Sequence, residues 1–378
     1  MKLVRTFHPV GHGAFYTERF YQNDPLTETP LFTAVLDCGC FEACKAGTNP
    51  QFFEQQINRA IDNVFNQGDI IDALFISHFH TDHINGIPHL FQKCTIKRIF
   101  VPILTPRVII EAYIYNFISS QNINNLGNNI LQKIYYDEDI SISQIRSFKN
   151  HKKKELSHND IDINKVKSKV LSSTTHLSVS PDWEYIPFNL LNGQMKSLLF
   201  KGSPFKHAIV NGKVDFDILR AIVTSLGVQT CQSIYKNTFP QGHNSYSMTV
   251  LSNNLRPLSL LSIRPLVVGV VQLSKCMYMG DFEANPTFPK RNNNFKSFEA
   301  FYFPYWNQVD LLQVPHHGSE HNYNQKLYNK KRVCLISSGD TDIYGHPDQY
   351  VVTEIQRNNC IYIIETETTP KLELTYRL

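Results

Sequence analysis

A histidine-rich loop in the first quarter of the chain limits the folds available to this sequence. The loop, Ser77-His78-Phe79-His80-Thr81-Asp82-His83, follows the apolar run at residues 73–76 and precedes an apolar helical stretch at residues 87–91. Histidine nitrogen and carboxylate oxygen are common ligands of divalent metal ions, and functional residues gather at the carboxyl ends of strands. In an extended segment His78 and His80 share a face, while Asp82 and His83 follow in the turn and can face a second position. This one loop therefore has ligands for two adjacent metal ions.

The order of apolar patterns around the loop predicts an α/β fold. Short apolar runs at residues 33–36, 73–76 and 96–101 indicate buried strands, and residues 50–67 carry apolar side chains at helical spacing between the first two. The C-terminal third repeats the alternation, with strands expected at 266–271, 275–279, 309–314, 333–337, 360–365 and 372–376 and helices at 295–303 and 349–357. Two such halves predict two sheets packed face to face with helices on the outside.

The middle of the chain, residues 104–242, fits this alternation poorly and is expected to be an insertion between the two halves. It contains helical patterns at 108–118 and 130–136, followed by a basic stretch at 146–169. That stretch holds eight cations, Arg146, Lys149, Lys152, Lys153, Lys154, Lys165, Lys167 and Lys169, against three acids, Glu155, Asp160 and Asp162. The resulting excess of five positive charges is larger than the net charge of +4 of the whole chain. Lys152, Lys153 and Lys154 are candidate contacts for a polyanion, although a charged run of this kind also occurs as a solvated loop.

Composition excludes several classes of protein. With 42% hydrophobic and 19% charged residues, the chain of 378 residues has enough apolar side chains for a core and too few charges for a disordered protein. Its most apolar stretch, residues 257–273, includes Arg264 and Gln272 and is too short and too polar to span a bilayer. The N-terminus lacks the apolar run of a signal peptide, so we expect a cytoplasmic protein without a membrane partner. The eight cysteines form no dense framework, which favours reduced thiols.

Further motifs make the chain resemble the metallo-β-lactamase-fold hydrolases, whose hallmark is the pattern His-x-His-x-Asp-His in this loop. Met279-Gly280-Asp281 is similar to the Gly-Asp motif of that family, Gly242 to Ser247 to its Gly-His-Thr-type motif, and Val314 to Ser319 to its final histidine motif. The resemblance implies a four-layered αββα sandwich with a helical and basic insertion, built by one catalytic domain over residues 1–378. It also implies two divalent metal ions, and nitrogen and oxygen ligands favour zinc, with manganese as a second choice. The implied ligands are His78, His80 and His243 for the first ion, Asp82, His83 and either His316 or His317 for the second, and Asp281 between the two.

Several motifs are more specifically similar to the branch that includes the hydrolase domain of bacterial DNA-uptake (ComEC-type) proteins. They are the Val-Pro-His-His-Gly-Ser run, Tyr344-Gly345-His346-Pro347, Gly11-His12-Gly13, the strand end at Leu36 to Gly39, and Asn244 with Ser247. The chain departs from that branch at His12, where glutamine is usual, and in lacking a stretch that reads as a membrane helix, so a channel role is not implied. We expect four residues to contact the ligands without binding metal themselves and to hold the ligands in orientation, namely Asp37, His12, Asn244 and Ser319.

Two assignments stay open at this level. Either His316 or His317 fits the final ligand, and the position relative to Pro315 slightly favours His317. His346 fits a residue that caps the turn before Pro347 and equally fits a proton donor to the leaving group. The expected catalytic residues are Asp82, His317 and His346.

The predicted reaction is metal-assisted hydrolysis, in which divalent ions lower the pKa of water and stabilise developing negative charge. A phosphodiesterase or nuclease acting on nucleic acid or nucleotides is favoured by the two-ion ligand set and by the ComEC-like motifs. One alternative is hydrolysis of a small-molecule ester, thioester, lactone or amide, with the insertion as a lid. Another is a binding or effector module whose metal site is structural. The sequence points to no protein partner.

Overall fold

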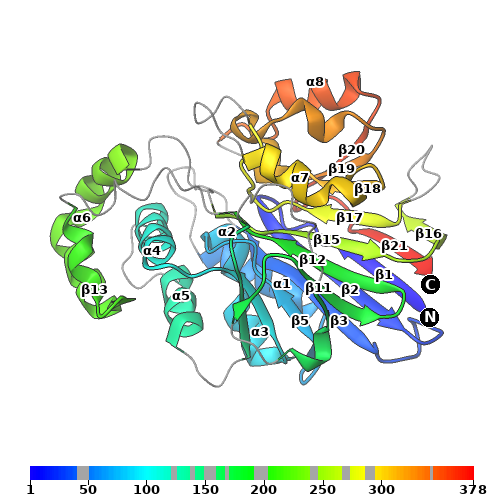
Figure 1. Cartoon of the computed structure of the whole chain (residues 1–378), viewed down its shortest axis with the longest axis horizontal. Coiled ribbons are helices and arrows are strands. Elements are labelled where there is room, and N and C mark those ends of the chain that lie inside the picture. The colour runs from blue at the N-terminus through cyan, green and yellow to red at the C-terminus, as the bar shows by residue number, and fades with distance from the viewer. Residues whose placement is uncertain are drawn as a thin grey trace.

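Two β-sheets stacked face to face form the centre of the computed structural model (Figure 1). The structure describes residues 1–40, 51–120, 126–136, 141–148, 159–166, 170–190, 203–238, 246–265, 273–285, 294–340 and 344–378. All statements below refer to these residues. The expected strand at 266–271 and the candidate lysines Lys152, Lys153 and Lys154 lie outside them.

The first sheet has nine strands among the described residues. In spatial order they are β10 (Val170–Leu171), β8 (Ile142–Ile145), β7 (Ile99–Pro102), β5 (Ala73–Phe75), β3 (Phe32–Cys40), β2 (Gly13–Tyr21), β1 (Lys2–Phe7), β21 (Leu372–Arg377) and β16 (Ser259–Arg264). The strands from β3 to β10 pair in parallel, whereas β3, β2, β1, β21 and β16 pair antiparallel. One end of this sheet is therefore antiparallel and combines the N-terminal strands β1 and β2 with β16 and the C-terminal strand β21.

The second sheet has eight strands among the described residues. Their order is β20 (Ile361–Glu365), β19 (Val333–Ser337), β18 (Val309–Gln313), β17 (Lys275–Tyr278), β15 (Thr249–Asn254), β12 (Trp183–Phe188), β11 (Thr175–Ser180) and β9 (Asn159–Asp162). Two further strand pairs lie apart from the sandwich sheets, β4 (Ile70–Ile71) with β6 (Thr95–Ile96) and β13 (Ile209–Val210) with β14 (Lys213–Val214). Most of the strands expected from apolar runs are thus present within a residue or two of their predicted ends.

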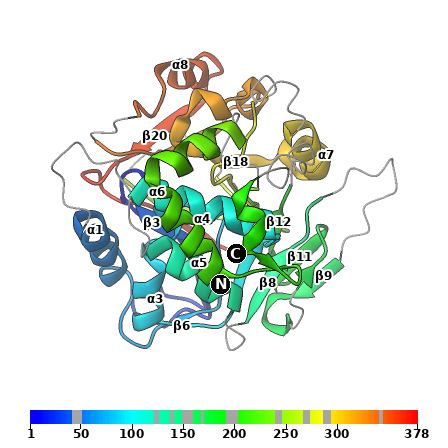
Figure 2. The same cartoon turned by 90° about the vertical axis from the view of Figure 1, so that its left-hand side faces the viewer.

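Helices cover the outer face of the second sheet and the outer face of the first sheet around β3, β5 and β7. They are α1 (Gln51–Asp62), α2 (Thr81–Ile84), α3 (Ile87–Lys93), α4 (Pro106–Ser120), α5 (Leu126–Tyr136), α6 (Phe216–Thr238), α7 (Asn294–Trp306) and α8 (Gln349–Arg357). One apolar cluster joins α1, α3, α4, α5 and α6 to the first sheet, a second fills the space between the sheets, and a third joins α7 and α8 to the second sheet. Three apolar layers separate four layers of secondary structure, so the predicted four-layered αββα sandwich is confirmed (Figures 1 and 2).

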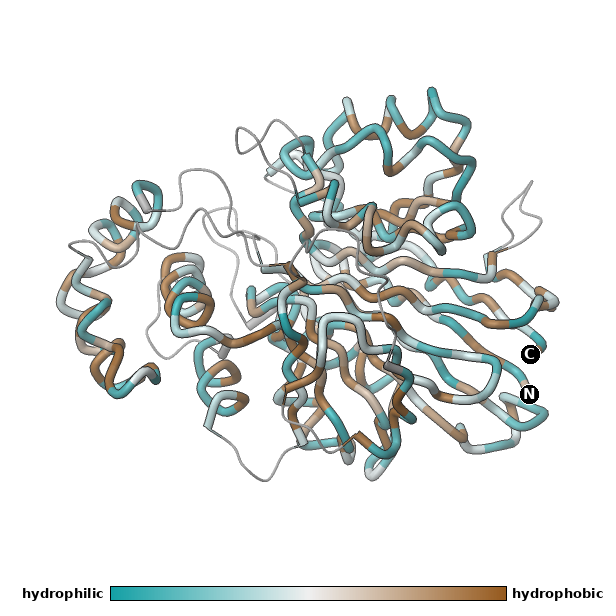
Figure 3. Tube along the Cα trace, in the orientation of Figure 1, coloured by the Kyte–Doolittle hydropathy of each residue, from teal (hydrophilic) through white to brown (hydrophobic). Residues whose placement is uncertain are grey.

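A buried ion pair lies in the otherwise apolar layer between the sheets. Hydropathy alternates along the strands (Figure 3), and most inward positions are apolar. Arg5 on β1 and Glu18 on β2 are both fully buried, with Nε and Oε1 2.6 Å apart. Tyr185 and Tyr278 from the second sheet donate hydrogen bonds to the Glu18 carboxylate at 2.7 and 2.9 Å. These hydrogen bonds connect the two sheets. The hydrophobic pattern of the sequence does not predict them.

The range 104–242, expected as an insertion, is divided between two places. Residues 142–145 and 170–171 extend the first sheet, and residues 159–162 and 175–188 extend the second. Of the described residues in this range, α4, α5 and the segment from 203 to 238 lie beside the sandwich, at the left of Figure 1. These strands were missed because β10 has only two residues, and because β8, β9 and β11 have four to six residues in which polar side chains interrupt the apolar pattern. In the part of the chain that is described, no helix combines the length and the apolar character needed to cross a membrane.

Candidate metal centre

The histidine-rich loop lies at the carboxyl end of β5 and leads directly into α2. Asp37, within the C-terminal half of the neighbouring strand β3, has a positive φ of 52° and turns its carboxylate toward this loop. The carboxylate accepts hydrogen bonds from the Ser77 backbone N–H and from Ser77 Oγ, each at 2.7 Å, and lies 2.9 Å from His83 Nδ1. A left-handed conformation is costly for a non-glycine residue, and such strain is typical of functional sites. Asp37 therefore fixes both the start of the loop and the orientation of one of its histidines.

Asp281 reaches the same place from the end of β17. The preceding Gly280 has a φ of 53°, and a Cβ atom there would lie 2.6 Å from Ser77 Cβ and 2.7 Å from Ser247 Oγ. Only glycine fits this close crossing of two segments. Ser247 accepts a hydrogen bond from the Asp281 backbone N–H at 3.0 Å. The Gly-Asp pair thus places a carboxylate within a few ångströms of the histidine loop.

The final histidine motif forms a strained turn after β18, in the short 3-10 segment η4 (Pro315–Gly318). His316, His317 and Gly318 have φ values of 50°, 53° and 83° in succession. This turn points the two histidines in different directions. His317 is buried and its Nε2 lies 3.1 Å from Asp82 Oδ2. His316 is 28% exposed, and its Nε2 lies 3.7 Å from Asp281 Oδ2.

Two groups of potential ligands converge and share Asp281. One contains Asp82, His83, Asp281 and His317, and the other contains His78, His80 and Asp281. Within each group the ligand atoms lie within 4.8 Å of one another, and all six residues are buried. His78 Nε2 lies 3.4 Å from Asp281 Oδ2, and His83 Nε2 lies 3.1 Å from Asp281 Oδ1. The arrangement matches two adjacent cation positions on either side of one carboxylate.

The inner ring nitrogens have the orientation that metal ligands need. In three histidines Nδ1 forms a hydrogen bond on the side of the ring away from the ligand cluster. The partner is Ser77 Oγ at 3.0 Å for His78, the Asp37 carboxylate for His83, and the Ser337 carbonyl at 2.8 Å for His317. The Nε2 atoms of His78 and His83 are buried and have no hydrogen-bond partner among the described residues. Engaging Nδ1 leaves Nε2 as the ligand atom, which is how outer residues orient metal-binding histidines. Buried Nε2 atoms that face two ionised carboxylates fit a pair of divalent ions.

The two carboxyl groups of the site, Asp82 and Asp281, have pKa values that favour the binding of cations. Burial by itself would raise the pKa of Asp82, but His83 and His317 hold that pKa well below its usual value. Burial also works to raise the pKa of Asp281, and His316, His83 and His78 outweigh it, so this carboxyl too has a pKa well below its usual value. Both carboxylates are therefore ionised at neutral pH. Two buried negative charges at one point require positive charge beside them, from imidazolium or from metal ions.

Most of the remaining predicted residues surround this centre. The His12 ring packs against the His317 ring at a centroid distance of 3.9 Å, and His12 Nε2 lies 3.9 Å from Asp82 Oδ2. The His346 ring lies 5.7 Å from that of His316 and 6.1 Å from that of His12. Ser319 is buried beside the turn, and its backbone N–H donates to the His316 carbonyl at 2.8 Å. His243 and Asn244 lie outside the described residues.

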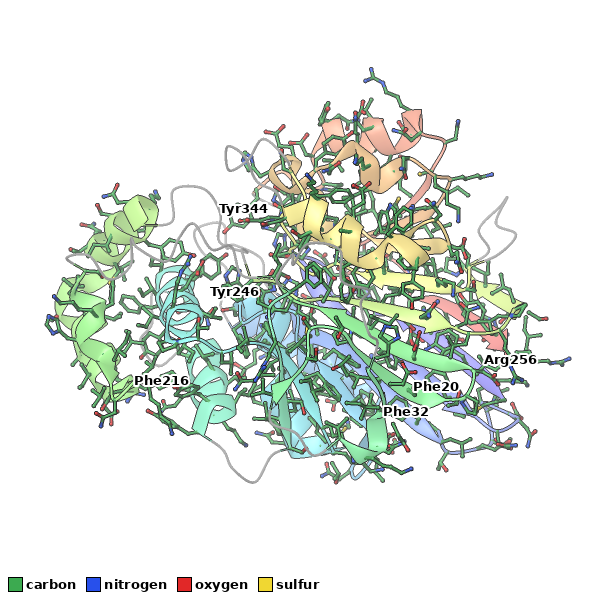
Figure 4. All side chains as sticks on the ribbon, viewed as in Figure 1. Phe20, Phe32, Phe216, Tyr246, Arg256 and Tyr344 are labelled. Atoms are coloured by element: carbon green, nitrogen blue, oxygen red, sulfur yellow. The ribbon has the colours of Figure 1, made fainter. Side chains whose placement is uncertain are left out.

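Several positioning residues were missed in the sequence. Helix α4 contributes Asn116, whose Nδ2 donates to the Phe79 carbonyl at 3.0 Å, and Tyr115, whose ring stacks on that of His80 at 3.7 Å. Gln313 Oε1 accepts hydrogen bonds from the backbone N–H groups of Met279 and Gly280, each at 2.7 Å. Figure 4 shows Tyr246, a neighbour of His78 and His80, between α4 and the sandwich. Nothing in the local sequence marks these residues, because each acts on a segment at least 33 positions away.

Comparisons with known proteins give limited matches. No protein-family model matches the chain. A segment of 115 residues, 30% of this chain, is 26% identical to Ribonuclease J of Mycoplasma genitalium and spans 18% of the length of that protein. Among solved structures, an archaeal metallo-beta-lactamase superfamily protein from Sulfolobus tokodaii aligns over 80% of this chain and 75% of its own, with 11% identity and a TM-score of 0.27.

Proposed function

We propose that this chain is a hydrolase that uses two divalent metal ions, with zinc favoured and manganese as the second choice, to cleave phosphodiester bonds in nucleic acid or nucleotides. The observation that carries the proposal is the pair of buried ligand groups that share Asp281. Two ions held by these residues would supply Lewis acidity at a scissile phosphate and would activate water at neutral pH. A structural site is more often a single closed set of four ligands.

The chain's own residues have distinct tasks in this proposal. His78, His80 and Asp281 hold one ion, with His243 as the further ligand that the sequence motif suggests. Asp82, His83, His317 and Asp281 hold the other. The Asp37 carboxylate lies 2.9 Å from His83 Nδ1 and accepts a hydrogen bond from it. This bond keeps the His83 proton on Nδ1, so that Nε2 stays available as a ligand atom.

His346 is the proposed proton donor to the leaving group. It lies on the rim of the centre, in contact distance of the aromatic ring of Tyr344 and near the exposed side of His316. His316 is then a supporting residue: its Nδ1 lies 2.7 Å from Asn322 Oδ1, and Asn322 in turn donates to the Asp281 carbonyl at 2.9 Å. A histidine outside the ligand set remains able to carry a proton at neutral pH.

The substrate class rests on two supports. The motifs shared with ComEC-type hydrolase domains point to DNA, and the local similarity to Ribonuclease J points to RNA. Both are phosphodiester polymers, and two-ion sites suit in-line displacement at phosphorus. We therefore favour a nuclease over a hydrolase of small esters.

The test is metal analysis followed by incubation with single-stranded and double-stranded DNA, RNA, cyclic nucleotides and a small ester, with and without chelator. The proposal expects bound metal, cleavage of at least one phosphodiester substrate, and loss of cleavage with chelator or with Asp281→Asn. Glu299→Gln, which neutralises a surface carboxylate paired with Lys326, is the matched control and should cleave normally. Cleavage of the ester alone refutes the substrate class. Bound metal that stabilises the fold without any turnover refutes the enzyme.

A further inference from the structure

One face of the sandwich carries an unusual concentration of positive charge, far along the sheet from the metal centre. It is the outer face of the four antiparallel strands β2, β1, β21 and β16. The register places Lys2 beside Tyr21 on one side and Arg377 on the other, and Thr6 beside Thr17 and Glu373. Residues paired in this way point to the same face of a sheet. The opposite face, with Leu3 and Arg5, belongs to the inter-sheet layer.

The charges on this face are strongly biased in sign. Its cations are Lys2, Arg19, Arg264, Lys371 and Arg377, and Glu373 is the one acid that these strand segments contribute in the described residues. The whole chain has 37 Lys and Arg against 33 Asp and Glu. An antiparallel sheet normally leaves one polar face in solvent, but that rule does not select cations over anions. The bias is therefore a property of this face.

The acidic residues near this face already have other partners. Glu373 pairs with Lys371 at 3.0 Å. Asp24, from the loop after β2, accepts hydrogen bonds from the Leu26 backbone N–H and from Thr27 Oγ1, each at 3.1 Å. Among the described residues no carboxylate lies within ion-pair distance of Lys2, Arg264 or Arg377.

Arg19 is held in place by other contacts, and no carboxylate of the described residues forms an ion pair with it. Its Nη2 donates to the Val64 carbonyl at 2.7 Å, and its guanidinium lies over the Phe65 ring at 4.7 Å. The charge of Arg19 is therefore fixed on β2, at the edge of the face next to β3. His8, at the end of the face nearest the metal centre, is neutral, because burial and then Arg19 and Lys371 lower its pKa to about 3.

The face is hollowed and lined with hydroxyl groups. A cleft of about 430 Å³ runs along β1 from Lys2 to His8, with the turn at Pro25 and Leu26 on one side and Arg264 on the other. Its floor includes Thr6, Thr17, Thr375 and Ser262. Lysine, arginine and hydroxyl side chains are the groups that contact phosphate oxygens in protein–nucleic acid complexes.

We propose that this basic sheet face, defined by Lys2, Arg19, Arg264, Lys371 and Arg377, binds the phosphodiester backbone of a nucleic-acid strand whose scissile bond lies at the metal centre. The inference deepens the proposed function and depends on it for the identity of the ligand. Beyond β1 the chain runs to His12, which packs on His317 of the centre. The six residues of β1 span about 20 Å, so a strand of several nucleotides connects the two places.

The test compares two triple variants. Lys2→Gln/Arg264→Gln/Arg377→Gln removes three cations from the face and keeps Arg19, which packs on Phe65. Lys296→Gln/Lys331→Gln/Arg357→Gln removes three exposed cations near α7 and α8 and has the same net charge. Binding of fluorescein-labelled single-stranded RNA and DNA of 20 nucleotides is measured by anisotropy in chelator, from 50 to 300 mM salt.

For the face variant we expect affinity at 0.1 M salt to fall 10- to 100-fold and the slope of log K against log salt to become shallower by about 2, since each phosphate contact to a single strand contributes about 0.7. The control variant should bind nearly as the parent does. Equal losses in both variants, or no loss in the face variant, overturn the proposal. Binding of anionic lipid vesicles through this face, with no binding of oligonucleotides, also overturns it.

A separate measurement distinguishes this failure from failure of the proposed function. Hydrolysis of bis(p-nitrophenyl) phosphate by the metal-loaded protein needs no extended strand and should be unchanged in the face variant. If the parent hydrolyses the small diester but the face variant still binds oligonucleotides normally, only the basic face is refuted. If no form of the protein hydrolyses any phosphodiester, the proposed function is refuted, while the binding assay still decides on the face.

Discussion

Glu365 is expected to make the stability of this protein fall as pH rises through the neutral range. It lies on β20, opposite Ser337 of β19, and is 1% exposed. No cation pairs with it in the described residues, and its Oε1 is buried without a hydrogen-bond partner there. Burial raises the pKa of this carboxyl to about 8, with a partly opposing hydrogen bond from the Leu372 backbone. The folded protein therefore keeps a proton on Glu365 that the unfolded chain has lost.

The sign and size of the effect follow from this difference in pKa. In the unfolded chain the carboxyl titrates near pH 4.5, and in the folded protein near pH 8. Between these values the folded state binds more protons, so the free energy of unfolding falls by about 1.4 kcal/mol per pH unit. Over the whole window Glu365 costs about 5 kcal/mol, and at pH 7 about 3 kcal/mol. Below pH 4.5 the cost disappears because both states are protonated.

Glu365→Gln tests this reasoning because it keeps the shape of the side chain and removes its titration. Urea unfolding followed by circular dichroism at pH 5, 6, 7 and 8, in chelator, gives the difference in unfolding free energy between variant and parent. We expect the variant to gain stability relative to the parent steadily from pH 5 to pH 8, by several kcal/mol in total. Glu299→Gln on the surface of α7 should show no such trend. A flat difference for Glu365→Gln between pH 5 and pH 8 refutes the reasoning.

Three further predictions concern the network behind the metal centre and the layer between the sheets. Asp37→Ala removes the carboxylate that orients His83, and zinc affinity measured by competition with a chromophoric chelator should fall 10- to 100-fold; unchanged affinity contradicts this role. Glu18→Ala leaves Arg5 buried without its carboxylate, so urea unfolding should show a loss of about 3 to 5 kcal/mol, and a loss below 1 kcal/mol argues against the buried pair. Asn116→Ala removes the hydrogen bond to the Phe79 carbonyl, with an expected loss of about 1 to 3 kcal/mol in the same assay and no loss if solvent replaces that bond.

The sequence predicted correctly those features that depend only on residues close together along the chain. The four candidate ligands at residues 78–83 occupy one loop, so their proximity follows from covalent spacing. The expected helix at 349–357 is α8 with the same ends, because Asp348 caps it through a hydrogen bond from the Tyr350 N–H at 2.8 Å. Both features need only neighbours along the chain.

Contacts between distant segments were beyond the reach of sequence patterns. Asp37 was expected to support the ligands, but its three hydrogen bonds to Ser77 and His83 depend on β3 and β5 lying side by side. The choice between His316 and His317 rests on a turn with two left-handed residues, which turns His317 toward Asp82. Neither geometry has a signature in residue spacing.

The sequence by itself determined the alternation of strands and helices and the local ligand loop, because both arise from hydrophobic period and covalent spacing. Only the tertiary structure decided that β8 and β10 extend the first sheet and that β9, β11 and β12 extend the second. It also decided that β17 and β18 deliver Asp281 and His317 to the loop at residue 80. It likewise decided where charge gathers, since Lys2, Arg264 and Arg377 share a face only through strand register. Register is set by pairing between segments hundreds of residues apart, which no local pattern specifies.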